Sequence, residues 1–423
     1  MISNKQFIAI DLGNTRISAM AAEIQPDGTL KILGEESKLA DDVKHGIVEQ
    51  RTGASSKVIE LKKLLQNSSK IHDISMVSVA IGAKTMKVVA SSVSRFVGKP
   101  NTVTDILLAE MAEECKRNFQ QPDITIFDII PISYFLDNKR TDEPIGKNGS
   151  QITGNYHLVI GNSLINEKIE GCFDRTGLLL EHTPTAVEAL STVLLEEEDR
   201  ELGCAMINLG ATTTTLAVYS EGVLQNLLVV PLGAKNITKD IQELGITEAN
   251  AERLKCLKGV ALESMVTDPI YIQIPDVDPN NPQVRISTKF LATIIEARLE
   301  EILHPIFETI TKLEFPLGAG IVITGGGSKL GSIIGFFEEK TDIQTRIGDH
   351  SGWLSEDTDV KYNDIRYAQL IGSIALTDEF RQQHPIEETV QEPSKKPKLP
   401  NKNLKEKITQ RMFNFFNDDN KLS

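Results

Sequence analysis

Two short segments, far apart in the chain, share one arrangement of residues that suits phosphate binding. Residues 7–20 read FIAIDLGNTRISAM, and residues 204–219 read CAMINLGATTTTLAVY. In each segment an apolar strand ends in Asp or Asn, then Leu and Gly. Small polar residues follow, and a second apolar strand begins. A glycine turn lets the backbone approach a phosphate closely with its N–H groups pointing at the oxygens. The repeat therefore predicts two hairpin turns that hold a nucleoside triphosphate.

A third glycine turn, Gly325-Gly326-Gly327-Ser328, follows the apolar strand 319–324. One such turn alone is more often a plain β-hairpin. Two copies in order, with a third turn after a buried strand, favour a nucleotide site. The residues predicted to contact nucleotide in the three turns are Gly13, Asn14, Thr15, Arg16, Gly210, Ala211, Thr212, Thr213, Gly325, Gly326, Gly327 and Ser328. Arg16 is expected to pair with a terminal phosphate. Asp11, at the end of a buried strand, is suited to hold Mg²⁺ through water.

The composition is that of a soluble globular protein with more than one domain. The chain has 423 residues, 40% of them hydrophobic, and a formal net charge of −14, which argues against general nucleic-acid binding. Its four cysteines form no CxxC pair and are expected to be reduced, mostly core residues. No signal-peptide pattern opens the chain, and no apolar run approaches the roughly 18 residues of a spanning helix. We therefore expect a soluble intracellular body.

Strand and helix patterns alternate along the chain, which predicts an α/β protein. The expected strands are 7–11, 16–24, 75–81, 86–91, 124–130, 156–160, 205–209, 214–219, 223–231 and 320–324. The expected helices are 55–67, 103–118, 163–176, 184–197, 247–257, 289–313 and 366–376. The region 269–288, rich in proline and asparagine, is expected to be a loop or a hairpin.

Taken together, these motifs resemble the actin/Hsp70 ATPase superfamily and, within it, the FtsA family of bacterial cell-division proteins. Segments 183–189 (TPTAVEA) and 367–373 (YAQLIGS) resemble the two connecting helices of that fold. The sequence ISMVSVAIG at 74–82 leads into an insertion that contains IIPISY and EPIG, and EDRELG runs into the second phosphate motif. The similarity covers roughly residues 5–380 and returns at the C-terminal helix.

The resemblance implies a two-lobed actin-like ATPase fold with an inserted subdomain. Subdomain 1A would comprise 1–83, 163–200 and 364–382; subdomain 1C, 84–162; subdomain 2A, 201–235 and 303–363; and subdomain 2B, 236–302. It also implies that Gly233 approaches the nucleotide and that Glu252 and Lys255 line its nucleoside side. The alternative for Glu252 and Lys255 is an ordinary solvated helix face.

Two departures from the superfamily pattern concern hydrolysis. The acid of the second phosphate motif is replaced by Asn208, whose amide cannot accept a proton or offset metal charge. Ala211 and Thr212 stand where glycines usually let phosphate touch the backbone. We expect ATP binding, with Mg²⁺, and weak or absent hydrolysis; loss of binding is the alternative. No catalytic residue is assigned, and Asp11, Asn208 and Glu188 are only weak candidates.

The C-terminal end differs sharply in composition from the rest. Residues 383–403 are rich in proline and lysine and are expected to form a flexible linker. Residues 404–416 are expected to form a basic amphipathic helix that binds an anionic membrane surface. Its membrane-binding residues would be Leu404, Ile408, Arg411, Met412, Phe413, Phe415 and Phe416. The alternative is a helix that docks in a partner groove.

By this resemblance the protein is a membrane-tethered cytoskeletal adaptor at the division site, on the cytoplasmic face of the cell membrane. It would self-associate head to tail into filaments and recruit the tubulin-like protein FtsZ, whose C-terminal peptide would bind subdomain 2B. The rival interpretation is a turnover enzyme of the same fold, either a phosphotransferase or a chaperone-like ATPase. Asn208 counts against efficient phosphoryl transfer, and no substrate-binding β domain follows the ATPase region.

Overall fold

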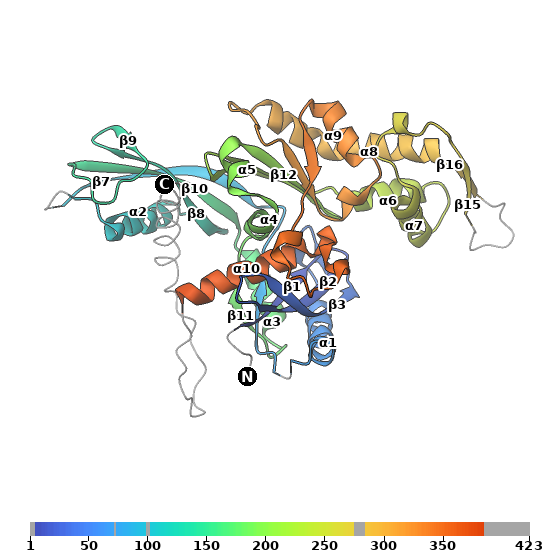
Figure 1. The fold of residues 1–423 in the computed structure, drawn as a ribbon, viewed down its shortest axis with the longest axis horizontal. Helices are drawn as coiled ribbons and strands as arrows, with labels where there is room; N and C mark the ends of the chain where they lie inside the picture. Colours follow the sequence, from blue (N-terminus) through green and yellow to red (C-terminus); the bar gives the residue numbers. More distant parts are fainter. Residues whose placement is uncertain (1–4, 72, 99–101, 275–283, 385–423) are drawn as a thin grey trace. The chain divides into compact units, whose positions relative to one another are not determined.

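The computed structural model describes residues 5–71, 73–98, 102–274 and 284–384. The chain divides into two compact units. The first unit comprises Met1–Lys84 and Ile165–Thr377, and the second comprises Thr85–Leu164 and Asp378–Ser423. Figure 1 labels the elements of both. Strands and helices alternate in the first unit, so the predicted α/β class is confirmed.

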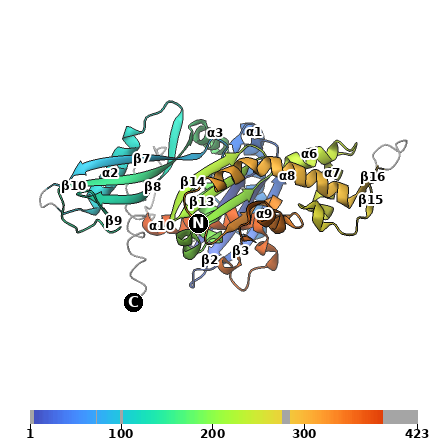
Figure 2. The ribbon, with the colours of Figure 1, turned by 90° about the horizontal axis from the view of Figure 1, so that it is seen from above.

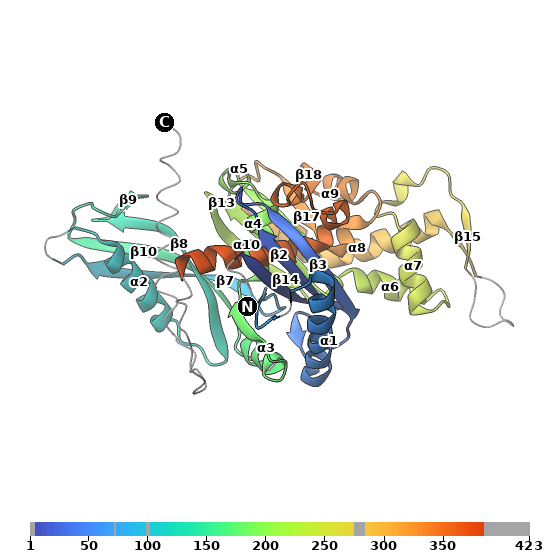
Figure 3. The ribbon, with the colours of Figure 1, turned by 60° about the horizontal axis from the view of Figure 1, so that its bottom comes forward.

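The first unit contains two five-stranded sheets, and the first has the order β11-β6-β1-β2-β3. Its strands are β1 (Gln6–Leu12), β2 (Arg16–Ile24), β3 (Leu30–Leu39), β6 (Met76–Val79) and β11 (Leu179–His182). β1, β2 and β3 run antiparallel in sequence, whereas β6 and β11 extend the sheet in parallel with β1. Helix α1 (Arg51–Ser69) lies against β2 and β3 (Figure 3) and buries Leu61 and Leu65 there.

The second sheet repeats this arrangement, in the order β14-β13-β12-β17-β18. Its strands are β12 (Cys204–Leu209), β13 (Thr214–Ser220), β14 (Val223–Val230), β17 (Ile321–Thr324) and β18 (Thr345–Ile347). Again three antiparallel strands are followed by two parallel ones. In register, Asp11 pairs with Ser18 in the first hairpin, and Asn208 pairs with Thr215 in the second. The repeat in the sequence is therefore a repeat in topology, with Asp11 and Asn208 in equivalent places.

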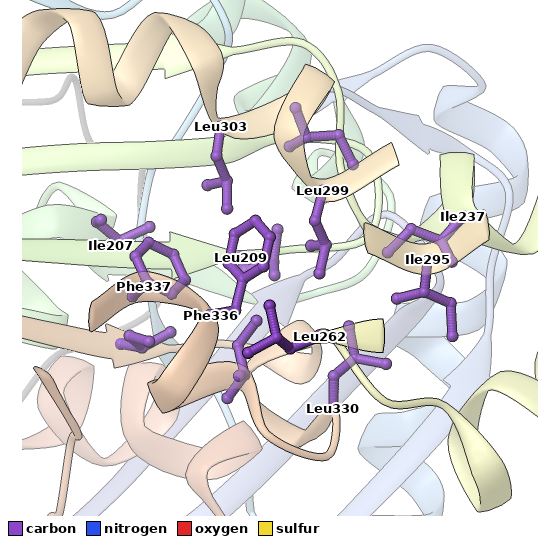
Figure 4. Packing of buried hydrophobic residues seen from close by; sticks show 14 of the residues in the cluster. Ile207, Leu209, Ile237, Leu262, Ile295, Leu299, Leu303, Leu330, Phe336 and Phe337 are labelled. Carbon is purple, nitrogen blue, oxygen red and sulfur yellow. The ribbon is translucent and has the colours of Figure 1, made fainter. Parts of the chain in front are cut away.

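The second sheet is covered by helices α8 (Thr288–Thr311) and α9 (Ile333–Thr341). Figure 2 shows α8 running across the sheet. Figure 4 shows the buried hydrophobic residues that pack between these helices and the sheet. Leu299 and Leu303 of α8 and Phe336 and Phe337 of α9 are fully buried in one core that also contains Ile207 of β12. Each such side chain contributes about 1.5–3 kcal/mol by leaving water. This core holds the strand ends that carry the second and third glycine turns.

Two further helices and a hairpin extend the second half of this unit. They are α6 (Ala234–Gln242), α7 (Glu248–Lys258), β15 (Tyr271–Ile274) and β16 (Val284–Ser287). Arg298 of α8 forms a bidentate ion pair with Asp240 of α6, which fixes α6 on the long helix. β15 and β16 pair antiparallel, so the hairpin expected within the region 269–288 is confirmed.

Helices α4 (Ala186–Leu194) and α10 (Ala368–Gln383) cross between the two sheets (Figure 1). Their backbones touch, because a Cβ added to Gly372 would overlap the carbonyl oxygen of Ala189. The remaining elements of the unit are β4 (Val43–Lys44), β5 (Ile47–Val48), α5 (Glu197–Leu202), η1 (Glu263–Met265), η2 (Gly326–Lys329), η3 (Ser351–Trp353), η4 (Val360–Asn363) and η5 (Ile365–Tyr367). Helix α3 (Leu164–Phe173) begins at the last residue of the segment Thr85–Leu164, where the chain returns to the first unit.

The described residues of the second unit between Thr85 and Asn162 form an antiparallel sheet, in the order β7-β10-β8-β9, with helix α2 on it. Its elements are β7 (Lys87–Phe96), α2 (Asp105–Asn118), β8 (Ile124–Leu136), β9 (Lys139–Thr141) and β10 (Gln151–Asn162). Tyr134 and Tyr156 meet edge to face in its core, with ring centroids 6.2 Å apart. Among the residues described in either unit, no helix is long and apolar enough to span a bilayer. The predicted membrane-binding residues, 404–416, lie outside the described ranges.

Candidate functional site

The two repeated hairpin turns have the same local geometry. A Cβ on Gly13 would lie 2.6 Å from the carbonyl oxygen of Arg16, and one on Gly210 would lie 2.8 Å from that of Thr213. The Gly210 amide donates to the Thr213 carbonyl over 3.0 Å. Both turns therefore need glycine at the same position, because the chain folds back over it.

The third glycine turn lies against the second. Gly325 has a φ of 84°, and its Cβ would lie 2.7 Å from the carbonyl oxygen of Leu209, at the end of β12. The Ser328 hydroxyl donates to the Gly325 carbonyl over 2.7 Å, which closes the turn on itself. Because β17 pairs in parallel with β12, the ends of the two strands bring these turns together.

Gly326 differs from its neighbours. It is exposed, its φ is not in the left-handed region, and no heavy atom lies within 4 Å of the place a Cβ would occupy. Nothing inside the described protein requires glycine there. Open space over a bare backbone at the third turn suits the approach of a ligand.

Gly233 approaches the second turn from another side. A Cβ on Gly233 would lie 2.6 Å from the carbonyl oxygen of Gly210. The next two amides, of Ala234 and Lys235, donate to the carbonyls of Gly210 and Ala211 over 2.9 and 2.8 Å. The first turn of α6 thereby holds the second glycine turn in place, and the predicted residue Gly233 is at its contact point.

A short hairpin that the sequence analysis did not single out joins the first and second turns. Its tip is His45-Gly46, between β4 and β5, with φ of 50° and 76°. The His45 amide donates to the Thr212 hydroxyl over 3.3 Å, and its Nδ1 lies 2.9 Å from the Thr212 carbonyl oxygen. The Gly46 amide donates to Oδ1 of Asn14 over 3.1 Å. The two-residue turn ending in Gly, between the short strands Val43–Lys44 and Ile47–Val48, was the available signal.

These contacts define what the predicted polar residues do in the structure. Asn14 and Thr212 each use a side-chain oxygen within the protein. Arg16 is exposed and donates from Nη1 to the hydroxyl of Ser37 over 2.8 Å. Thr15 is exposed beside it, and Thr213 supplies the carbonyl that closes the second turn. Their role toward a phosphate stays a prediction.

Asp11 is the carboxylate of the first turn. Loss of hydration in the surrounding protein raises its pKa to about 6. Its Oδ1 accepts a hydrogen bond from Nε2 of Gln369, on α10, over 2.8 Å. Because 358 positions separate the two residues, no local sequence pattern predicts this pair. Glu188, the other acidic candidate, lies in the first turn of α4, where its backbone N–H donates to the hydroxyl of the N-cap residue Thr185.

Glu252 and Lys255 lie on α7 and form a network with the start of α6. Lys255 is only 7% exposed, and its Nζ donates to the Ala234 carbonyl (3.0 Å), the Thr238 hydroxyl (2.8 Å) and Oε2 of Glu252 (2.8 Å). Burial acts to raise the pKa of Glu252, but the hydrogen bonds from Lys255 and Thr238 outweigh it, so the pKa is lowered. The pair therefore anchors α7 to the residue next to Gly233.

The structure thus brings together the three glycine turns, Gly233 and Asp11, and joins Glu252 and Lys255 to them through Ala234. Among the described residues, no group of three or more His, Cys, Asp or Glu side chains is placed to hold a metal ion. Cys115, Cys172 and Cys204 are buried, as expected of core thiols, whereas Cys256 is exposed.

Comparisons with known proteins match this chain to one family of cell-division proteins. The family model described as cell division protein FtsA matches residues 205–372. The FtsA protein of Neisseria meningitidis is 28% identical over 357 residues, which cover 82% of this chain and 85% of the relative. That of Escherichia coli K12 is 25% identical over 358 residues, covering 81% and 84%.

Solved structures agree on the fold. The PilM–PilN type IV pilus biogenesis complex contains a chain that superposes with a TM-score of 0.60 at 14% identity, covering 89% of this chain and 98% of that one. MreB5 of Spiroplasma citri bound to ADP gives a TM-score of 0.56 at 13% identity, covering 90% and 98%. These similarities show the actin-like fold alone. Fold, family model and curated relatives agree: this chain has an actin-like fold and is similar to the FtsA family of cell-division proteins.

Proposed function

We propose that this protein binds ATP with Mg²⁺ between its repeated glycine turns and acts as a membrane-tethered adaptor for FtsZ filaments in cell division. The observation that carries the nucleotide site is the convergence of three glycine turns, with Gly326 open over the third. Solved structures of MreB5, which shares the fold, hold ADP or AMPPNP, and this supports a nucleotide here.

Asp11 is the residue that would hold Mg²⁺, through water. Mg²⁺ commonly binds one or two carboxylates and completes its shell with phosphate oxygens and water. A single carboxylate at the first turn fits that pattern. A bound Mg²⁺ also stabilises the ionised carboxylate, which burial disfavours in the absence of the metal.

Weak hydrolysis follows from the position equivalent to Asp11 in the second hairpin. Asn208 stands there, and its amide neither takes a proton from water nor adds negative charge beside a metal. Nucleotide then serves as a clamp between the two halves of the first unit. Binding to one conformation stabilises it, and the closed form would favour head-to-tail self-association.

The remaining parts of the proposal rest on the family and on the sequence. The division into subdomains 1A, 1C, 2A and 2B is proposed with the boundaries given above, and the FtsZ C-terminal peptide is proposed to bind residues 236–302. The basic amphipathic segment 404–416 would attach the protein to anionic lipid on the cytoplasmic face of the cell membrane. Relatives named as cell-division proteins support action at the division site.

Substitution of Gly326 tests the nucleotide site without disturbing the fold. Gly326→Val places a branched side chain over the third turn, where no protein atom is within 4 Å. Gly352→Val is the matched control, because Gly352 also lies exposed in a 3-10 turn with no atom within 4 Å. Equilibrium binding of ATP with Mg²⁺, by titration calorimetry, is expected to weaken by about tenfold or more in Gly326→Val. Gly352→Val should bind as the unsubstituted protein does.

Thermal unfolding without nucleotide completes the design. Both variants are expected to unfold at the temperature of the unsubstituted protein. If the unsubstituted protein binds no ATP, or if Gly326→Val binds it equally well, the proposed site is wrong.

A further inference from the structure

We infer that Gln369 is a positioning residue of the proposed nucleotide site: its side-chain amide fixes the Asp11 carboxylate so that one oxygen faces the first glycine turn. This inference rests on the proposed function. The sequence motif around this glutamine suggested only a connecting helix.

The two oxygens of Asp11 face different partners. Oδ1 accepts the hydrogen bond from Nε2 of Gln369 over 2.8 Å. Oδ2 lies 3.4 Å from the place where a Cβ on Gly13 would be, at the turn itself. The glutamine therefore occupies one oxygen on the helix side and leaves the other on the side of the predicted phosphates.

The backbone of Gln369 is itself fixed. One turn further along α10, Gly372 packs on the backbone of Ala189, and a Cβ there would overlap the carbonyl oxygen of Ala189. Ahead of it, the Tyr367 hydroxyl donates to Glu35 of β3 over 3.4 Å. A donor whose backbone is held on both sides sets the orientation of its partner more firmly than a donor on a loop does.

An amide suits this task better than a cation. Lys or Arg at this place would pair with the carboxylate and offset the negative charge that attracts Mg²⁺. Gln donates a hydrogen bond without adding charge. The carboxylate thus keeps its full charge for the metal, while its rotation is restricted. The expected consequence is a contribution to ATP affinity that depends on Mg²⁺.

The experiment compares ATP binding with Mg²⁺ and in EDTA for three proteins: unsubstituted, Gln369→Met and Gln382→Met. Met keeps the length and helix propensity of Gln but donates nothing. Gln382 is a matched control, because it also hydrogen-bonds an aspartate, Asp378, from α10. Gln369→Met should weaken binding with Mg²⁺ by about fivefold or more and leave binding in EDTA within about twofold. Gln382→Met should leave both unchanged.

A double substitution tests whether the glutamine acts through Asp11. In an Asp11→Asn background, Gln369→Met should have no further effect with Mg²⁺, because coupled residues are not additive. Equal weakening of binding with Mg²⁺ and in EDTA would indicate only a structural role and overturn the inference. Binding of ATP by Gln369→Met that is unchanged both with Mg²⁺ and in EDTA would also overturn the inference. The same holds if the unsubstituted protein binds ATP with equal affinity with Mg²⁺ and in EDTA. If the unsubstituted protein binds no ATP at all, the proposed function fails and the inference fails with it.

Discussion

His45 and Thr212 are joined by two hydrogen bonds, although 167 positions separate them in the chain. His45 is at the tip of the β4–β5 hairpin, beside the first half of the repeat, and Thr212 belongs to the second glycine turn. The neighbouring Gly46 amide binds Asn14 of the first turn over 3.1 Å. One hairpin tip therefore connects the two turns that are proposed to hold the phosphates.

The contribution of this connection is measurable. His45→Ala removes the ring contact to Thr212 and places alanine at a φ of 50°. We expect the free energy of unfolding to fall by about 1–2 kcal/mol, because the hydrogen bond is lost and alanine must adopt a positive φ. His45→Gly loses the same contact without the conformational cost, so it should be the milder variant. Urea denaturation of both checks this, and a His45→Gly protein less stable than His45→Ala would contradict it.

Asp11 should oppose the stability of the ligand-free protein at neutral pH. Its folded-state pKa of about 6 is above the ordinary 3.8, so the folded state binds the proton more tightly. Stability from this group is present below about pH 4 and is lost as pH rises to about 6. Asp11→Asn is therefore expected to stabilise the ligand-free protein near pH 7.5 by about 1–3 kcal/mol, while it weakens ATP binding with Mg²⁺.

Thermal unfolding of the two proteins across about pH 5–8 checks the sign, because the difference between them isolates Asp11 from the other carboxyl groups. The difference in unfolding temperature between the two proteins should widen as pH rises and level off above about pH 7. A variant that is less stable than the unsubstituted protein at neutral pH would show that the carboxylate is not destabilised by burial.

The contact between α4 and α10 predicts a strong effect of one methyl group. Gly372→Ala pushes a Cβ into the carbonyl oxygen of Ala189, so the helices must separate. We expect the free energy of unfolding to fall by about 2–4 kcal/mol, as it does for overpacked core sites. Gly335→Ala is the control: it lies in α9 with no atom within 4 Å, and helix propensity should make it stabilising by about 0.5–1 kcal/mol. Equal stability of the two variants would contradict the packing account.

The repeat in the sequence predicted both hairpins, and with them the equivalence of Asp11 and Asn208, because local alternation and glycine turns determine them. The long helix expected at 289–313 was found as Thr288–Thr311 for the same reason. Strand β3 was not predicted: its sequence, LKILGEESKL, alternates weakly because it is an edge strand with charged side chains. The hairpin of His45 and the Asp11–Gln369 pair depend on tertiary contacts, which no local pattern encodes.

Strand β7 shows how pairing overrides local pattern. Apolar residues predicted only 86–91, whereas the strand runs over Lys87–Phe96. Its second half is rich in serine, yet each residue pairs with β10, and the Ser94 hydroxyl lies 2.7 Å from that of Thr153.

Lys255 has contacts that the family pattern did not indicate. That pattern pointed to the nucleoside, whereas the structure shows a buried ammonium with three acceptors within the protein. A role toward nucleotide stays a prediction for it.

The proposed membrane attachment is tested by truncation. The full chain and a chain ending at His384 are mixed with liposomes that contain anionic lipid, in the presence of ATP. We expect only the full chain to sediment with them, because residues 404–416 combine apolar and basic side chains. A variant with Phe415→Glu and Phe416→Glu should also remain in solution. If the truncated chain sediments as well as the full one, the attachment is elsewhere.

Amide hydrogen exchange with and without ATP and Mg²⁺ tests the central claim most directly, because it reports where on the chain the nucleotide acts. Nucleotide held between the glycine turns should slow exchange in residues 12–16, 209–213 and 325–328 together. The strands of the second unit, such as β7 and β10, should serve as an internal reference with unchanged exchange. Protection confined to one of the three turns, or absent from all of them at saturating nucleotide, would contradict a shared site.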